Sequence, residues 1–122
     1  MPRKILYIDD NPQSIVLVSK WLAQAGYEFK GASSGEEGIT QAEAYTPELV
    51  LIDIDLGDMT GIEVVQKLRK LPGFATIPFV AFTGNVRRVD REHYLANGFD
   101  FHLGKPVTQR ELLNVLTQLL DK

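Results

Sequence analysis

The sequence predicts an α/β protein with a doubly wound, five-stranded parallel sheet and helices on both of its faces. Short apolar runs alternate along the chain with longer segments of helical periodicity, which is typical of parallel strands joined by helical crossovers. Three helical segments also open with the spacing of a capping box, each shortly after a predicted strand. With 122 residues, 44% of them hydrophobic, the chain has the size of one domain with its own core.

Five strands are expected. Three of them are continuous apolar runs, at 5–8, 49–52 and 79–82. These runs are too short for helices and show no alternation, as strands buried on both faces do. Two weaker strands are expected at Glu28–Ala32 and Phe101–Leu103.

Five helices are expected, one after each strand. The first opens at Asn11-Pro12, where proline is acceptable in the first turn, and ends at Gly26. The capping boxes of three others are Ser34 with Glu37, Thr60 with Glu63, and Thr108 with Glu111. The weakest helical pattern, 89–96, ends at Asn97-Gly98.

Composition excludes several classes of function. The chain has 13 Lys and Arg against 16 Asp and Glu, a net charge of −3, which argues against direct binding of nucleic acid. It has no cysteine, so disulfides, thiolate metal sites and cysteine nucleophiles are absent. No apolar stretch is long enough for a signal peptide or a membrane span. We expect a soluble, cytoplasmic protein, with residues 1–122 forming a single domain and no output domain in the chain.

Polar side chains gather where the predicted strands end. They are Asp9 and Asp10 after the first strand, Asp53 after the third, Thr83 and Gly84 after the fourth, and Gly104, Lys105 and Pro106 after the fifth. Alone, each has an ordinary explanation, such as a turn former, a helix cap or a solvated lysine. Together they mark a site, because ligands of open parallel sheets bind beyond the carboxyl ends of the strands.

The residue types at this edge indicate phosphoryl chemistry with a hard cation. Three neighbouring carboxylates repel one another, and Mg²⁺ or Mn²⁺ would relieve the repulsion, whereas zinc prefers His and Cys ligands. A carboxylate such as Asp53 can be the nucleophile and form an aspartyl phosphate. Lys105 can neutralise phosphoryl oxygens, and Thr83 can donate its hydroxyl to one of them.

These motifs resemble the receiver domain of two-component response regulators over nearly the whole chain. The matching stretches are Ile8-Asp9-Asp10-Asn11, Leu51-Ile52-Asp53-Ile54, Met59-Thr60-Gly61, Phe82-Thr83-Gly84, and Gly98 through Pro106. The resemblance implies a flavodoxin-like strand order of 2-1-3-4-5. It also implies that Asp53 accepts a phosphoryl group from a histidine kinase or phosphotransfer protein. The chain would then be no enzyme with an external substrate, and would catalyse only its own phosphotransfer and dephosphorylation.

The resemblance assigns the metal ligands residue by residue. Asp10 and Asp53 would bind Mg²⁺ directly, Asp9 would hold it through water, and the backbone carbonyl of Asp55 would complete the protein ligands. Phosphorylation would then draw Thr83 inward, while Lys105 would contact phosphate from a backbone with a cis bond before Pro106.

Three positions depart from the family pattern. His102 stands where the family has a strand 5 aromatic that swings inward, so His102 is either the switch residue or an ordinary half-buried histidine. As the switch, its titration near neutral pH could add pH sensitivity. Gly57 replaces a frequent proline and predicts a more mobile loop. Gly84 replaces a frequent alanine and predicts easier access to the phosphoryl group.

The signal would be read on the face of the fourth helix, fifth strand and fifth helix. We expect this face to include Arg87, Arg88, Arg91, Tyr94, Gln109 and Arg110, and to bind an output protein or a second copy of the chain. The phrase Gly98 to Leu103 resembles receivers attached to hybrid kinases, although a free single-domain regulator fits equally.

Two rival functions share part of the pattern. Asp53-Ile54-Asp55-Leu56 also resembles the Asp-x-Asp loop of haloacid-dehalogenase-type phosphatases, with Asp53 as nucleophile and Asp55 as acid–base. That motif normally follows the first strand, and it leaves Asp9 and Asp10 unexplained. A degenerate receiver that only binds partners is the second rival, although every acidic residue and the lysine are present. Flavodoxin-like cofactor binding is disfavoured by an acidic turn after the first strand.

Overall fold

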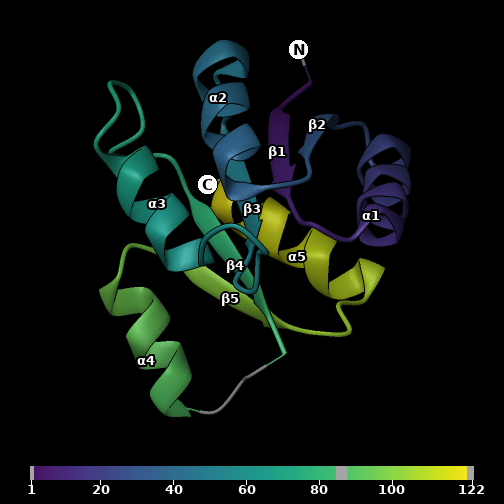
Figure 1. Cartoon of the computed structure of the whole chain (residues 1–122). Coiled ribbons are helices and arrows are strands. Elements are labelled where there is room, and N and C mark those ends of the chain that lie inside the picture. Colours follow the sequence, from purple (N-terminus) through teal and green to yellow (C-terminus); the bar gives the residue numbers. More distant parts are fainter. Residues whose placement is uncertain (1, 85–87, 121–122) are drawn as a thin grey trace.

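The computed structural model describes residues 2–84 and 88–120. Its five parallel strands form one sheet in the order β2-β1-β3-β4-β5, flanked by five helices (Figure 1). The elements are β1 Lys4–Ile8, α1 Pro12–Gln24, β2 Glu28–Ala32, α2 Gly35–Tyr45, β3 Leu49–Asp53, α3 Gly61–Arg69, β4 Phe79–Thr83, α4 Arg88–Ala96, β5 Phe101–Gly104 and α5 Gln109–Leu120. The predicted fold class and strand order are confirmed. Among these helices, none is long and apolar enough to cross a membrane.

The sheet separates two hydrophobic cores. Helices α1 and α5 cover one face, and α2, α3 and α4 cover the other (Figure 1). Along β1 and β3 the side chains alternate between the two cores: Ile5 and Leu49 pack under α1 and α5, whereas Leu6 and Val50 pack on the opposite face. Every residue of β3 and β4 is buried. Burial on both faces explains why these strands are continuous apolar runs.

The helix starts follow the predicted capping chemistry. The Asn11 side chain accepts a hydrogen bond from the Gln13 amide at 2.9 Å and caps α1. Complete capping boxes begin α3 at Thr60 and α5 at Thr108. At α2 the Ser34 hydroxyl accepts from the Glu37 amide, but the Glu37 carboxylate reaches back to the amide of residue 33. The capping box of α2 therefore has one of its two hydrogen bonds, the one from the Glu37 amide to the Ser34 hydroxyl.

Arg69, at the end of α3, ties together the segments that enter β4 and β5. Its guanidinium donates to the carbonyl oxygens of Ile77 and Gly98, both at 2.7 Å, and to the Asp100 carboxylate at 2.7 Å. Asp100 in turn accepts the backbone amide of Phe79 at 2.8 Å. This network fixes the start of two neighbouring strands, and so the register of the edge where they end.

Candidate functional site

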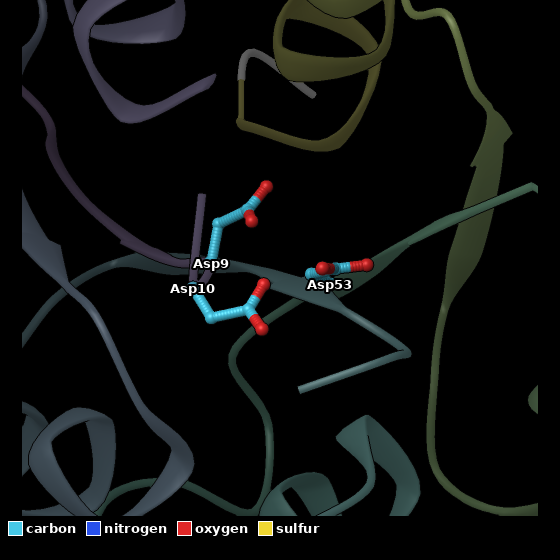
Figure 2. A group of neighbouring side chains, drawn as sticks. All are labelled: Asp9, Asp10 and Asp53. Carbon is cyan, nitrogen blue, oxygen red and sulfur yellow. The ribbon is translucent and has the colours of Figure 1, made fainter. Parts of the chain in front are cut away.

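Three aspartates meet at the carboxyl edge of the sheet. Asp9 and Asp10 follow β1, and Asp53 is the last residue of β3 (Figure 2). One carboxylate oxygen from each lies within 4.8 Å of the others. Asp9 and Asp53 are buried, while Asp10 is exposed. The neighbouring positions of β1 and β3 in the sheet bring these residues together across more than forty positions of sequence.

Asp53 lies in an environment that disfavours its negative charge. The residue is only 3% exposed, and this burial, together with the nearby Asp9 carboxylate, raises the pKa of Asp53. Two donors oppose the rise: the Lys105 ammonium at 2.9 Å and the Asp55 backbone amide at 3.3 Å, both on Oδ1. The Asp53 carboxylate is therefore buried and held in one orientation, and additional positive charge nearby would stabilise its ionised form.

Lys105 and Thr83 reach the site from the two strands beyond β3. The Lys105 ammonium lies 2.9 Å from Asp53 and 4.0 Å from Asp9, so it bridges the two buried carboxylates. Its backbone amide donates to the Thr83 carbonyl at 2.8 Å, which keeps the end of β5 beside the end of β4. The bond between Lys105 and Pro106 is cis. The Thr83 side chain, 2% exposed, lies at the same edge.

Tyr7 is a site residue that the sequence did not single out. Its hydroxyl donates to Oδ2 of Asp9, whose Oδ1 accepts the Asn11 amide at 2.9 Å. Burial, reinforced by the bond to Asp9, raises the pKa of Tyr7, so the phenol stays protonated and remains a donor. The sequence does contain an indication of this contact. Tyr7 and Asp9 are two residues apart at the end of a strand and so share a face, and a buried tyrosine hydroxyl needs a hydrogen-bond partner.

The loop after β3 is fastened at both ends. The Gly61 amide donates to the Ile54 carbonyl at 2.9 Å, and a Cβ on Gly61 would lie 2.8 Å from the Asp53 carbonyl oxygen. Only glycine therefore allows α3 to start this close to the phosphorylation candidate. The Asp58 carboxylate accepts the amides of Gly35 and Glu36 at the start of α2, which lowers the pKa of Asp58. Gly57 directly precedes the anchored Asp58, and the loop mobility predicted from Gly57 remains a prediction.

The residue beside Thr83 is Tyr94 of α4. The hydroxyl oxygens of the two side chains lie 3.1 Å apart, and both side chains are buried. His102 is half-buried, with its ring 6.4 Å from that of Tyr94. Burial and the nearby charge of Arg91 lower the pKa of His102, which favours the neutral ring at physiological pH. The predicted switching of His102 is not tested by this arrangement.

The expected signalling face needs one correction. Tyr94 was expected on the surface, but it is 6% exposed because its ring belongs to the core under α2, α3 and α4. Arg91 and Arg110 are exposed, as a binding face requires, and Gln109 is half-buried. Arg87 lies outside the described residues, and so does the side chain of Arg88.

The aspartate cluster suits a hard divalent cation. It offers carboxylate oxygens and no histidine or cysteine, which is the donor set of Mg²⁺ and of Mn²⁺ rather than of zinc. Asp55, by contrast, is exposed, and its side chain lies outside the cluster. The metal contact that the resemblance assigned to the backbone carbonyl of Asp55 remains a prediction.

The chain belongs to the response regulator receiver domain family, whose model matches residues 5–117. Among its relatives, the alkaline phosphatase synthesis transcriptional regulatory protein PhoP of Bacillus subtilis is 33% identical over 92% of this chain. The chain spans 46% of the length of PhoP.

Solved structures agree with this family. The chemotaxis protein CheY4 of Vibrio cholerae superposes with a TM-score of 0.94 at 28% identity, covering 98% of this chain and 100% of that one. The receiver domain of the sensor histidine kinase PA1611 from Pseudomonas aeruginosa gives a TM-score of 0.91 at 25% identity, with 100% of both chains covered. That PA1611 structure holds a magnesium ion coordinated in its active-site cleft. The chain is thus similar both to a chemotaxis protein and to a receiver that is part of a kinase.

Proposed function

We propose that this receiver domain is a phosphoacceptor whose nucleophile is Asp53, and that phosphorylation changes its binding to an output protein. One observation carries the proposal. Asp9, Asp10 and Asp53 bring carboxylate oxygens within 4.8 Å of one another, and Lys105 lies 2.9 Å from Asp53. This is a site for a cation and a phosphoryl group rather than for an uncharged ligand.

The chemical step is an in-line displacement at phosphorus. A carboxylate oxygen of Asp53 attacks the phosphorus of a phosphohistidine, the phosphorus–nitrogen bond breaks, and its electron pair returns to the imidazole of the donor. The products are an aspartyl phosphate and a free histidine. Hydrolysis of the aspartyl phosphate by water later restores the carboxylate, so the domain catalyses only its own modification and its reversal.

The surrounding side chains neutralise and orient. Asp10 and Asp53 would hold Mg²⁺ directly, with Asp9 acting through water, and bound Mg²⁺ supplies positive charge to the ionised carboxylate and to the phosphoryl oxygens. Manganese fits the same donor set. Lys105, already paired with Asp53, can pass to a phosphoryl oxygen, since a lysine ammonium has three donors on a flexible stem. Thr83 donates its hydroxyl to another oxygen.

The phosphoryl donor is a histidine kinase or a phosphotransfer protein, and α1 offers it an apolar surface beside the site. Val16 and Leu17 are large apolar side chains that are 60% and 48% exposed. Leu17 also lines a groove of about 420 Å³ between α1 and the β5–α5 connection, and Lys105 lines the same groove. A donor helix seated there would bring its histidine close to Asp53.

Two assays separate the proposed function from the phosphatase and the binding-module alternatives. Acetyl phosphate with Mg²⁺ should add one phosphoryl group to the intact chain, measured by mass spectrometry, and Asp53→Ala should abolish the gain. Asp55→Asn, which removes a neighbouring exposed carboxylate, should keep it. No mass gain in the unaltered chain would favour the binding module, and many turnovers on p-nitrophenyl phosphate would favour the phosphatase.

The output of the proposed switch is protein binding. The exposed Arg91 and Arg110 suit an acidic partner or a second copy of the chain, whereas the net charge of −3 does not suit nucleic acid. The absence of cysteine fits a cytoplasmic setting for this exchange.

A further inference from the structure

The described part of α4 is anchored to the sheet by a single buried side chain. Within residues 91–96, Tyr94 is 6% exposed, and the other five side chains are exposed. The Tyr94 ring packs edge-on against Phe99 at 6.3 Å, in the core under α2, α3 and α4. The helix lies at the edge of the molecule beside β5 (Figure 1). A change at Tyr94 would therefore alter how this helix rests on the sheet.

The hydroxyl of this anchor is bonded into the phosphorylation site. Tyr94 Oη lies 3.1 Å from Thr83 Oγ1, and the Thr83 side chain is 2% exposed. A threonine hydroxyl has one proton to donate and two lone pairs that accept. When the Thr83 hydroxyl donates its proton to a phosphoryl oxygen, its hydrogen bond to Tyr94 can persist only with the Tyr94 hydroxyl as the donor. It also persists only if Tyr94 moves together with Thr83.

His102 is less well placed for this role. Its ring contacts are stacking on Phe101 at 6.3 Å and a tilted approach to Tyr94 at 6.4 Å. Among the described contacts, the phenol of Tyr94 meets the Thr83 hydroxyl directly. A side chain of α4 thus lies within hydrogen-bond distance of Thr83, whereas the family resemblance had pointed to a residue of β5.

We propose that Tyr94 is the positioning residue that couples the phosphorylation site to α4. Its hydrogen bond orients the Thr83 hydroxyl in the unphosphorylated chain, and displacement of Thr83 toward Asp53 shifts or releases the buried anchor of the helix. The inference rests on the proposed function, because it needs a phosphoryl group on Asp53. It adds the residue through which the change at Asp53 reaches the surface near Arg91.

The test uses beryllofluoride with Mg²⁺ as a phosphoryl mimic on the whole chain. Fluorine NMR reports whether beryllofluoride binds, and backbone amide shifts of residues 91–96 report the response of α4. In the unaltered chain we expect binding and a clear α4 response. In Tyr94→Phe, which keeps the ring and loses the hydroxyl, we expect binding to persist while the α4 shifts fall by at least threefold.

Two control variants and one further measurement complete the design. Tyr45→Phe removes a hydroxyl that bonds Glu28 far from the site, and should keep the full α4 response. His102→Phe should keep it as well. In the unaltered chain, the ring resonances of Tyr94 should shift on beryllofluoride binding, so the inference can be judged even if Tyr94→Phe folds poorly.

The outcomes separate the two proposals. No beryllofluoride signal in the unaltered chain would remove the proposed function and this inference with it. Binding with an undiminished α4 response in Tyr94→Phe, or with an unmoved Tyr94 ring, would overturn the inference alone. Loss of the response in His102→Phe, with Tyr94→Phe intact, would return the coupling role to strand 5.

Discussion

Replacing Asp53 with asparagine should stabilise the metal-free chain. The substitution keeps the shape of the side chain and removes one charge from a cluster of three carboxylates. Burial and Asp9 raise the pKa of Asp53, so its ionised form opposes folding at neutral pH. Repulsion among the three carboxylates would thus destabilise the folded chain until a cation binds.

The size of the effect follows from the distances. Two unit charges 4.8 Å apart, the outer limit for oxygens of this cluster, repel by about 3.5 kcal/mol at an effective dielectric constant of about 20. The Lys105 ammonium, 2.9 Å from Asp53, attracts it by about 5.7 kcal/mol on the same scale. The repulsions from Asp9 and Asp10 together are about as large as this attraction, so burial, the largest cause of the raised pKa of Asp53, decides the sign. We expect Asp53→Asn to gain about 1 kcal/mol, or roughly 3–5 °C in Tm.

Urea and thermal unfolding with a chelator, and then with Mg²⁺, measure this effect. At a concentration of Mg²⁺ ten times its Kd, the unaltered chain should gain about 1.4 kcal/mol, and Asp53→Asn should lose most of that gain. The folded pKa of Asp53 is raised, so the advantage of the variant should vanish below the ordinary aspartate pKa of about 3.9 and grow as pH rises through the raised value.

Asp55→Asn is the matched control, since it removes an exposed charge outside the cluster. It should change stability little and keep the response to Mg²⁺. A metal-free Asp53→Asn variant less stable than the unaltered chain would refute the reasoning, because the Lys105 contact would then outweigh the repulsion. If Asp53→Asn and Asp55→Asn gained equal stability, the effect would come from the change in net charge and not from the carboxylate cluster.

Three further predictions concern packing, docking and the Arg69 network. Gly61→Ala should lower the free energy of unfolding by about 1–3 kcal/mol, because its Cβ would lie 2.8 Å from a backbone oxygen, whereas Gly84→Ala, with no atom of the described residues within 4 Å, should be nearly neutral in urea unfolding. Leu17→Ser should slow phosphotransfer from a phosphorylated histidine phosphotransfer domain several-fold and leave the acetyl phosphate rate unchanged; equal slowing with both donors would argue against docking on α1. Arg69→Met should cost about 2–3 kcal/mol in the same unfolding assay, since six hydrogen bonds of the guanidinium are lost, three of them at 2.7 Å, and a loss under about 0.5 kcal/mol would show that water replaces them.

The fold could be predicted because its sequence signals are local and agree with one another. The apolar runs of β3 and β4 reflect burial on both faces, and the capping residues Thr60 and Thr108 mark helix starts that the structure reproduces. The members of the site could be predicted for a topological reason. Parallel strands end at the same edge, so residues that follow them meet there whatever their separation in sequence.

The contacts of Tyr7 and Tyr94 could not be predicted in the same way. Tyr94 follows four polar residues, 90–93, in the weakest helical pattern, so the residues before it favour an exposed position. Its burial is decided by how α4 docks beside β5, which is a tertiary property with no local signal. The apolar ring of Tyr7 is enough to explain its position in a buried strand. The ring alone does not indicate that the hydroxyl donates to Asp9.

The division of the core by the sheet also affects how signals compete. The groove proposed for the donor lies against α1 on one face, while α4 docks on the other. An output protein that binds α4 would then approach from the side opposite the donor, whereas one that also contacts Arg110 of α5 would lie on the donor's side. For an output protein confined to α4, we expect a ternary assembly to form, so that the domain can be phosphorylated again while it remains bound. The duration of its output would then be governed by the lifetime of the aspartyl phosphate rather than by competition for one surface.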